Sequence, residues 1–104
     1  MDLKSVVIAK HIESDNFWKK KFNSEEEAIE FKNTLANRNY NEYEIVGLIK
    51  EKRSNHRWCL CIKKPKKDGE KEIMFFNSKK SCILAARLIK DYDNDLKITC
   101  TKKY

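Results

Sequence analysis

Strand-like and helix-like patterns of apolar residues follow one another in the same order in both halves of the chain. Each half has two short stretches rich in β-branched and aromatic residues, then a helical pattern, then a further strand pattern. In the first half these stretches are 5–12, 17–22, 25–38 and 43–52. In the second half they are 56–64, 71–76, 79–91 and 96–103. Each half therefore predicts a ββαβ unit.

The two predicted helices begin with the same tripeptide, Phe-Asn-Ser, in "FNSEEEA" and "FNSKKSC". Ser24 and Ser78 are the expected N-caps, and Glu27 completes a Ser-x-x-Glu capping box in the first copy. This correspondence indicates an internal repeat at an offset of 54 residues. Duplication of one unit and independent use of one capping motif explain it about equally well.

Apolar residues mark the buried face of each predicted helix. The first has Ala28, Phe31 and Leu35 on one side, and the second has corresponding residues at Cys82, Ala85 and Ile89. The second helix is apolar around most of its circumference because of four further residues, Ile83, Leu84, Ala86 and Leu88. Either this helix is the more buried one, which is the simpler interpretation, or its extra face contacts a partner, including a second copy of the chain in a homodimer.

These patterns predict one α+β domain built from two tandem units, 1–53 and 54–104. We expect an antiparallel-rich sheet of about six strands with two helices on one face. A chain of 104 residues, 40% hydrophobic and 11% aromatic, suits a single folded domain. Neither an export signal nor an apolar run of membrane-spanning length is present, so we expect a cytoplasmic protein with reduced thiols and no membrane association.

The net charge of +7 comes entirely from the second half. Residues 1–53 contain ten basic and ten acidic side chains, whereas residues 54–104 contain 13 basic and 6 acidic ones. Such asymmetry is typical of a face that binds an anion. The first unit is therefore near neutral and the second is the candidate binding unit.

Two basic stretches of the second half are the candidate anion site. One is the predicted hairpin tip "KKPKKDGEK", and the other is the start of the second helix. The candidate residues are Lys63, Lys64, Lys66, Lys67, Lys71, Ser78, Lys79 and Lys80. Lysines in the first turn lie at the positive end of the helix dipole, which is unfavourable by a few tenths to about 1 kcal/mol. A bound phosphate would make the same arrangement favourable, because the lysines and the helix end would both attract it. Solvated surface lysines explain the pattern about as well.

The spread of these lysines favours a polyanion, DNA or RNA, over a small metabolite. Only 4 of the 23 basic side chains are arginine, which indicates recognition of backbone or shape more than of bases. Five aromatic residues are candidates for stacking on bases: Phe17, Trp18, Trp58, Phe75 and Phe76. Aromatic residues in strands are, however, more often part of the core.

Metal and catalytic chemistry have little support in the sequence. Cys59 and Cys61 do not form a paired zinc knuckle, and the four cysteines have apolar neighbours typical of core thiols. His11 and His56 belong to no recognisable nucleophile–base motif. We therefore expect a non-enzymatic protein with no metal and no cofactor.

A small chain rich in lysine and asparagine and without catalytic motifs resembles phage and mobile-element accessory proteins in composition. Anti-CRISPR proteins belong to that group. The resemblance implies an alternative function, inhibition of a host nucleoprotein machine by protein–protein contact. The first hypothesis remains direct binding of nucleic acid by the basic unit, and the alternative partner is a nucleoprotein complex.

Overall fold

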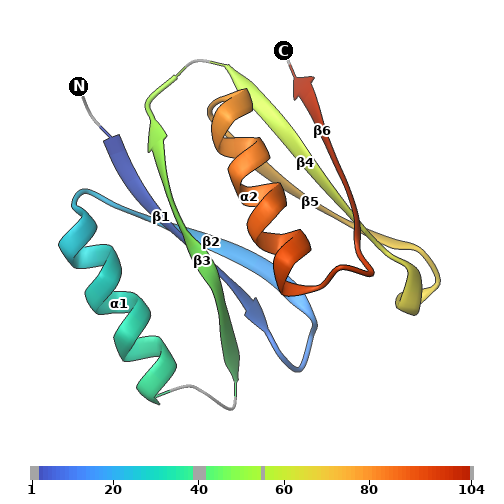
Figure 1. Cartoon of the computed structure of the whole chain (residues 1–104), viewed down its shortest axis with the longest axis horizontal. Coiled ribbons are helices and arrows are strands. Elements are labelled where there is room, and N and C mark those ends of the chain that lie inside the picture. Colours follow the sequence, from blue (N-terminus) through green and yellow to red (C-terminus); the bar gives the residue numbers. More distant parts are fainter. Residues whose placement is uncertain (1–2, 39–41, 55, 104) are drawn as a thin grey trace. The chain divides into compact units, whose positions relative to one another are not determined.

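The computed structural model describes residues 3–38, 42–54 and 56–103, and the chain divides into two compact units, Met1–Lys52 and Arg53–Tyr104. Figure 1 shows the helices and strands of both units. The first unit contains β1 (Leu3–His11), β2 (Asn16–Phe22), α1 (Glu25–Arg38) and β3 (Tyr43–Lys52). The second contains β4 (Arg57–Lys64), the short 3-10 helix η1 (Pro65–Lys67), β5 (Glu70–Phe76), α2 (Lys79–Tyr92) and β6 (Lys97–Lys103).

The two units share one topology. Each is a three-stranded antiparallel sheet whose central strand is the first strand of the unit, in the orders β2-β1-β3 and β5-β4-β6. A single helix packs on one face of each sheet (Figure 1). The α+β class, the six strands and the two ββαβ units are therefore confirmed. The six strands divide into two sheets of three, one in each unit.

The central strand of the first unit supplies the largest share of its core. Val6, Val7, Ile8 and Ala9 have no exposed surface, so both faces of β1 are buried at these positions. On the helix side, the predicted stripe is confirmed: Ala28 and Leu35 are buried and Phe31 is half-buried. The hydroxyl of Ser24 accepts a hydrogen bond from the Glu27 amide at 3.2 Å, as an N-cap does.

The core of the second unit lies between α2 and one face of its sheet. Buried strand residues on this face include Leu60, Ile62, Met74 and Phe76, and they pack against the buried side of α2 formed by Cys82, Ala85 and Ile89. The four further apolar residues of α2 are half-buried instead. The predicted buried stripe is thus confirmed, and the remaining circumference of the helix is partly exposed.

Element boundaries differ from the predictions by a few residues. β1 begins at Leu3, α2 ends at Tyr92, and the predicted turn at 65–70 contains a 3-10 helix. The predicted connection at 39–42 lies mostly outside the described residues, which exclude 39–41. Among the helices of the described ranges, none is long and apolar enough to cross a membrane.

Candidate nucleic-acid interface

The face of the second sheet opposite α2 is here called the open face. Side chains alternate between the two sides of a strand, so the residues that share a side follow from the strand register. The open face carries ten described side chains: Arg57, Cys59, Cys61, Lys63, Lys71, Ile73, Phe75, Lys97, Thr99 and Thr101. None of them is a carboxylate, so the face is uniformly basic, hydroxylic or apolar.

Three lysines lie directly opposite one another across this face. Lys63 on the central strand pairs with Lys71 on β5 and with Lys97 on β6. All three are exposed, and within the described residues none of them forms an ion pair. Like charges directly opposite in a sheet are destabilising, whereas opposite charges are stabilising by about 0.2–1 kcal/mol. We call this set the lysine row.

The hairpin turn accommodates the central lysine of the row. Gly69 has φ of +76°, a left-handed conformation that suits glycine, and it follows Asp68 at φ of +58°. A Cβ atom at Gly69 would lie 3.3 Å from Cε of Lys63. The aliphatic part of Lys63 therefore lies close against the turn, with the glycine leaving space for it.

Two large apolar side chains lie next to the lysine row on the same face. Ile73 is 56% exposed and Phe75 is 42% exposed. The guanidinium carbon of Arg57 lies 5.7 Å from the centre of the Phe75 ring, within cation–π range. The open face thus has cations at both ends and an exposed aromatic ring between them.

The other four aromatic candidates are used in packing. Phe17 and Phe76 are buried, and Trp18 contacts Phe31 and Tyr43 edge-on at centroid distances of 6.1 and 5.5 Å. Trp58 is half-buried on the helix side of its sheet. Of the five, only Phe75 is exposed enough for a base to stack on its ring.

The corresponding face of the first unit is built differently. The row equivalent to the lysine row is Phe17, Lys10 and Glu44, with one aromatic, one basic and one acidic residue. Lys10 also forms an ion pair with Asp15 at 2.6 Å. The shared topology therefore does not require three lysines at this position, and the charge cluster is a property of the second unit.

Lys64, a predicted site residue, is not available to a ligand. Its side chain is 3% exposed on the helix side of the sheet, and its Nζ lies 2.9 Å from Oε1 of Glu72. The strand pattern contained the signal for this, because Lys64 has the same parity as Leu60 and Ile62. Lys64 therefore belongs to the buried side.

Lys66 and Lys67 lie on η1 at the hairpin tip. Lys66 Nζ is 2.9 Å from Oδ2 of Asp95, in the connection before β6. This hydrogen bond, together with the charge of Asp95, raises the pKa of Lys66, and the same contact lowers the pKa of the Asp95 carboxyl. Lys66 is thus engaged in holding two loops together, whereas Lys67 is exposed beside it.

Ser78, Lys79 and Lys80 begin α2, at the end of the sheet remote from the hairpin tip (Figure 1). The seven residues of β5 separate these two sites by about 20 Å. The hydroxyl of Ser78 accepts from the Ser81 amide at 3.1 Å, and Ser81 Oγ accepts from the Ser78 amide at 3.3 Å. Ser78 is therefore confirmed as the N-cap, in a Ser-x-x-Ser capping box. The two predicted basic stretches do not meet at one point.

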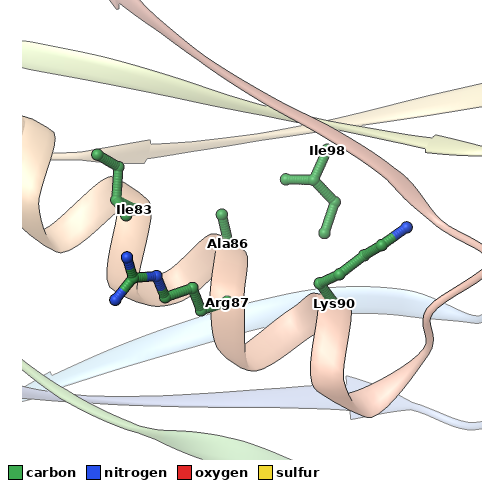
Figure 2. Close-up of a pocket in the computed structure, with 5 residues that line it drawn as sticks. All are labelled: Ile83, Ala86, Arg87, Lys90 and Ile98. Carbon is green, nitrogen blue, oxygen red and sulfur yellow. The ribbon is translucent and has the colours of Figure 1, made fainter.

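The exposed side of α2 forms two shallow grooves. The first groove has a volume of about 310 Å³. Figure 2 shows the residues that line it, which are Ile83, Ala86, Arg87 and Lys90 of α2 and Ile98 of β6. The charged ends of Arg87 and Lys90 point away from each other, and Lys90 donates to the carbonyls of Asn94 and Leu96 at 2.6 Å. A second groove, of about 500 Å³, is lined by Lys79, Lys80, Ile83, Leu84 and Arg87. Neither groove brings together an acid, a base and a nucleophile.

The four cysteines are free and lie on different sides of the second unit. Cys59 and Cys61 are on the open face, whereas Cys82 and Cys100 are on the helix side. In the described ranges, no group of three or more histidine, cysteine, aspartate or glutamate side chains could hold a metal ion. Cys59 and Cys82 are buried, as small core residues are.

One histidine contacts a serine. His11 Nδ1 lies 3.0 Å from Ser14 Oγ, and the same nitrogen accepts a hydrogen bond from the Ser14 amide at 3.2 Å. The ring also contacts Tyr43 edge-on at 5.0 Å. These local bonds shape the turn between β1 and β2, so a structural role accounts for the pair.

Comparison with known proteins adds no relative. No protein-family model matches the chain, and no curated protein or solved structure matches it either. The function must therefore be inferred from the chemistry of the open face.

Proposed function

We propose that this protein is a non-enzymatic nucleic-acid-binding protein that holds the phosphate backbone on the open face of its second unit. The observation that carries the proposal is the lysine row, in which Lys63 lies directly between Lys71 and Lys97. Four free thiols suit a reducing compartment, and we place this activity in the cytoplasm.

A polyanion explains why three like charges lie in register. The Cα atoms of the row span about 10 Å across three strands, so its ammonium groups can contact neighbouring phosphates. Each neutralised phosphate removes a repulsion between lysines and releases counterions. Lysine contacts a phosphate as a point charge and reads no base edge, so binding should depend little on sequence.

Fluorescence anisotropy with labelled DNA and RNA oligonucleotides tests the proposal. Binding should be measurable at low salt and weaken as salt rises, with a log–log slope of about −2 for three phosphates on a single strand. Lys63→Glu/Lys71→Glu should abolish it. Lys79→Glu/Lys80→Glu changes the net charge equally at the remote helix start and should weaken binding much less.

Two outcomes would count against the proposal. If neither DNA nor RNA binds at low salt, the open face has another role. If both double variants lose affinity equally, net charge drives the interaction and this face does not.

A second candidate is protein contact through α2, as in an inhibitor of a host nucleoprotein machine. The supporting observation is the groove of about 500 Å³, in which half-buried Ile83 and Leu84 lie between basic side chains. Such a mixed surface suits an acidic protein partner. A partner retained after nuclease treatment of a lysate, and lost with Leu84→Glu, would favour this function.

A further inference from the structure

The open face combines two features that a duplex-binding surface does not need. The lysine row can hold phosphates, and Phe75 presents an exposed ring two register positions from Ile73 and four from Lys71 along the same strand. Four residues of strand correspond to about 13 Å. A nucleic acid that contacts both features must therefore expose a base as well as its backbone.

Bases in a duplex are stacked on one another and present only their edges to a protein. A ring on a flat sheet can contact the face of a base only when that base is unstacked, as in single strands, loops and ends. The major groove admits a helix or a two-stranded ribbon, whereas the open face is a three-stranded sheet. Both considerations favour single strands over duplex.

Arg57 supports the same preference. Its guanidinium lies 5.7 Å from the centre of the Phe75 ring, so it can contact the phosphate of a nucleotide whose base stacks on that ring. Arg57 comes two residues before Cys59, the register partner of Phe75. A single strand running along the sheet would thus meet a cation, then the ring and Ile73, then the lysine row.

We infer that the ligand of the open face is single-stranded nucleic acid, with one base stacked on Phe75 and the adjoining backbone on the lysine row. This inference rests on the proposed function and adds the class of nucleic acid. DNA and RNA share the chemistry involved, because every base has a π-face and every nucleotide has a phosphate.

The first experiment compares single strands with duplex. Anisotropy is measured with short homopolymers of deoxythymidine and of uridine, and with a duplex of equal length, for the full chain and for Phe75→Leu. Leucine keeps an apolar side chain and removes the π-face. We expect single strands to bind more tightly than duplex, and Phe75→Leu to weaken single-strand binding by about 5- to 150-fold while leaving duplex binding unchanged.

A second readout needs no variant. Cys61 is half-buried on the open face, in register with Ile73, whereas Cys100 is half-buried on the helix side. Bound homopolymer should slow the alkylation of Cys61 by a maleimide, mapped by mass spectrometry, and leave Cys100 unaffected. Equal protection of both thiols would contradict binding at the open face.

The outcomes separate this inference from the proposed function. The inference is overturned if duplex binds as tightly as single strands, or if Phe75→Leu keeps full single-strand affinity. Neither result contradicts the proposed function, in which the lysine row binds phosphates. Loss of binding in Lys63→Glu/Lys71→Glu with no effect of Phe75→Leu likewise overturns the inference and leaves the proposed function standing. Absence of all nucleic-acid binding overturns both.

Discussion

Lys64 Nζ lies 2.9 Å from Glu72 Oε1 on the helix side of their sheet, where the two side chains are 3% and 17% exposed. Lys63, the preceding residue, is exposed on the opposite face. Strand alternation thus gives two adjacent lysines opposite roles, one in the stability of the unit and one in its surface charge.

The buried pair gives a prediction about stability. Glu72→Ala would leave the Lys64 ammonium buried without this carboxylate, and should lower the free energy of unfolding by about 3–5 kcal/mol. The double variant Lys64→Met/Glu72→Leu removes both charges and should recover most of that loss. Urea denaturation measures both, and a Glu72→Ala protein as stable as the parent would contradict the pairing.

The lysine row predicts a conflict between stability and binding. Lys63→Glu places a carboxylate between Lys71 and Lys97, converting two like-charge pairs into attractive ones. The free energy of unfolding should rise by about 0.5–2 kcal/mol, while affinity for nucleic acid falls. Lys63→Gln is the matched control and should lie between the two proteins in both measurements. A Lys63→Glu protein that is less stable than the parent would show that repulsion within the lysine row does not destabilise the unit.

The start of α2 gives a third prediction. Lys80→Glu puts a favourable charge at the positive end of the helix and should raise the free energy of unfolding by about 0.3–1 kcal/mol. Lys79→Glu should gain less, because Lys79 Nζ lies 5.9 Å from the centre of the Trp58 ring, a cation–π contact of about 0.5–1 kcal/mol. Denaturation of the two single variants side by side tests the difference.

The contact between Lys66 and Asp95 predicts a pH dependence. The lowered pKa of Asp95 means that its stabilising effect is present above the ordinary aspartate pKa and is lost as pH falls through the lowered one. The raised pKa of Lys66 means that its effect is present below the ordinary lysine pKa and is lost as pH rises through the raised one. The contact should therefore be complete between about pH 4 and pH 10.

A carboxyl NMR titration measures the Asp95 side of this prediction. The midpoint should lie below that of an ordinary aspartate and return toward it in Lys66→Met. High salt should reduce the difference, since both side chains are well exposed. An Asp95 midpoint that Lys66→Met leaves unchanged would rule the contact out in solution.

Local pattern was sufficient to predict the elements and their order. β-branched runs, the Phe-Asn-Ser caps and the apolar stripes at Ala28 and Cys82 identify two ββαβ units, because each signal lies within a few residues along the chain. The division of the strands into two sheets depends on which edges pair, and no local signal records that choice.

The candidate site was harder to predict for the same reason. A single basic hairpin predicts Lys63 and Lys71, but Lys97 joins them only through the pairing of β4 with β6, which are far apart in the sequence. The basic hairpin also points to Lys64 as a ligand residue, whereas its parity with Ile62 indicates the burial that the structure shows. Lys79 and Lys80 begin α2 at the other end of β5 from the hairpin, so the two basic stretches stay separate clusters.

The positions of Lys71 and Lys97 on β5 and β6 have one more consequence. These are the edge strands of their sheet, where unpaired backbone groups can join the edge of another sheet, and lysines on an edge discourage that association. Exposed Ile73 and Phe75 would favour it. A ligand that neutralises the lysines would also remove this protection. The free protein should therefore stay dispersed, and it should self-associate when bound phosphates neutralise the positive charge of the lysines.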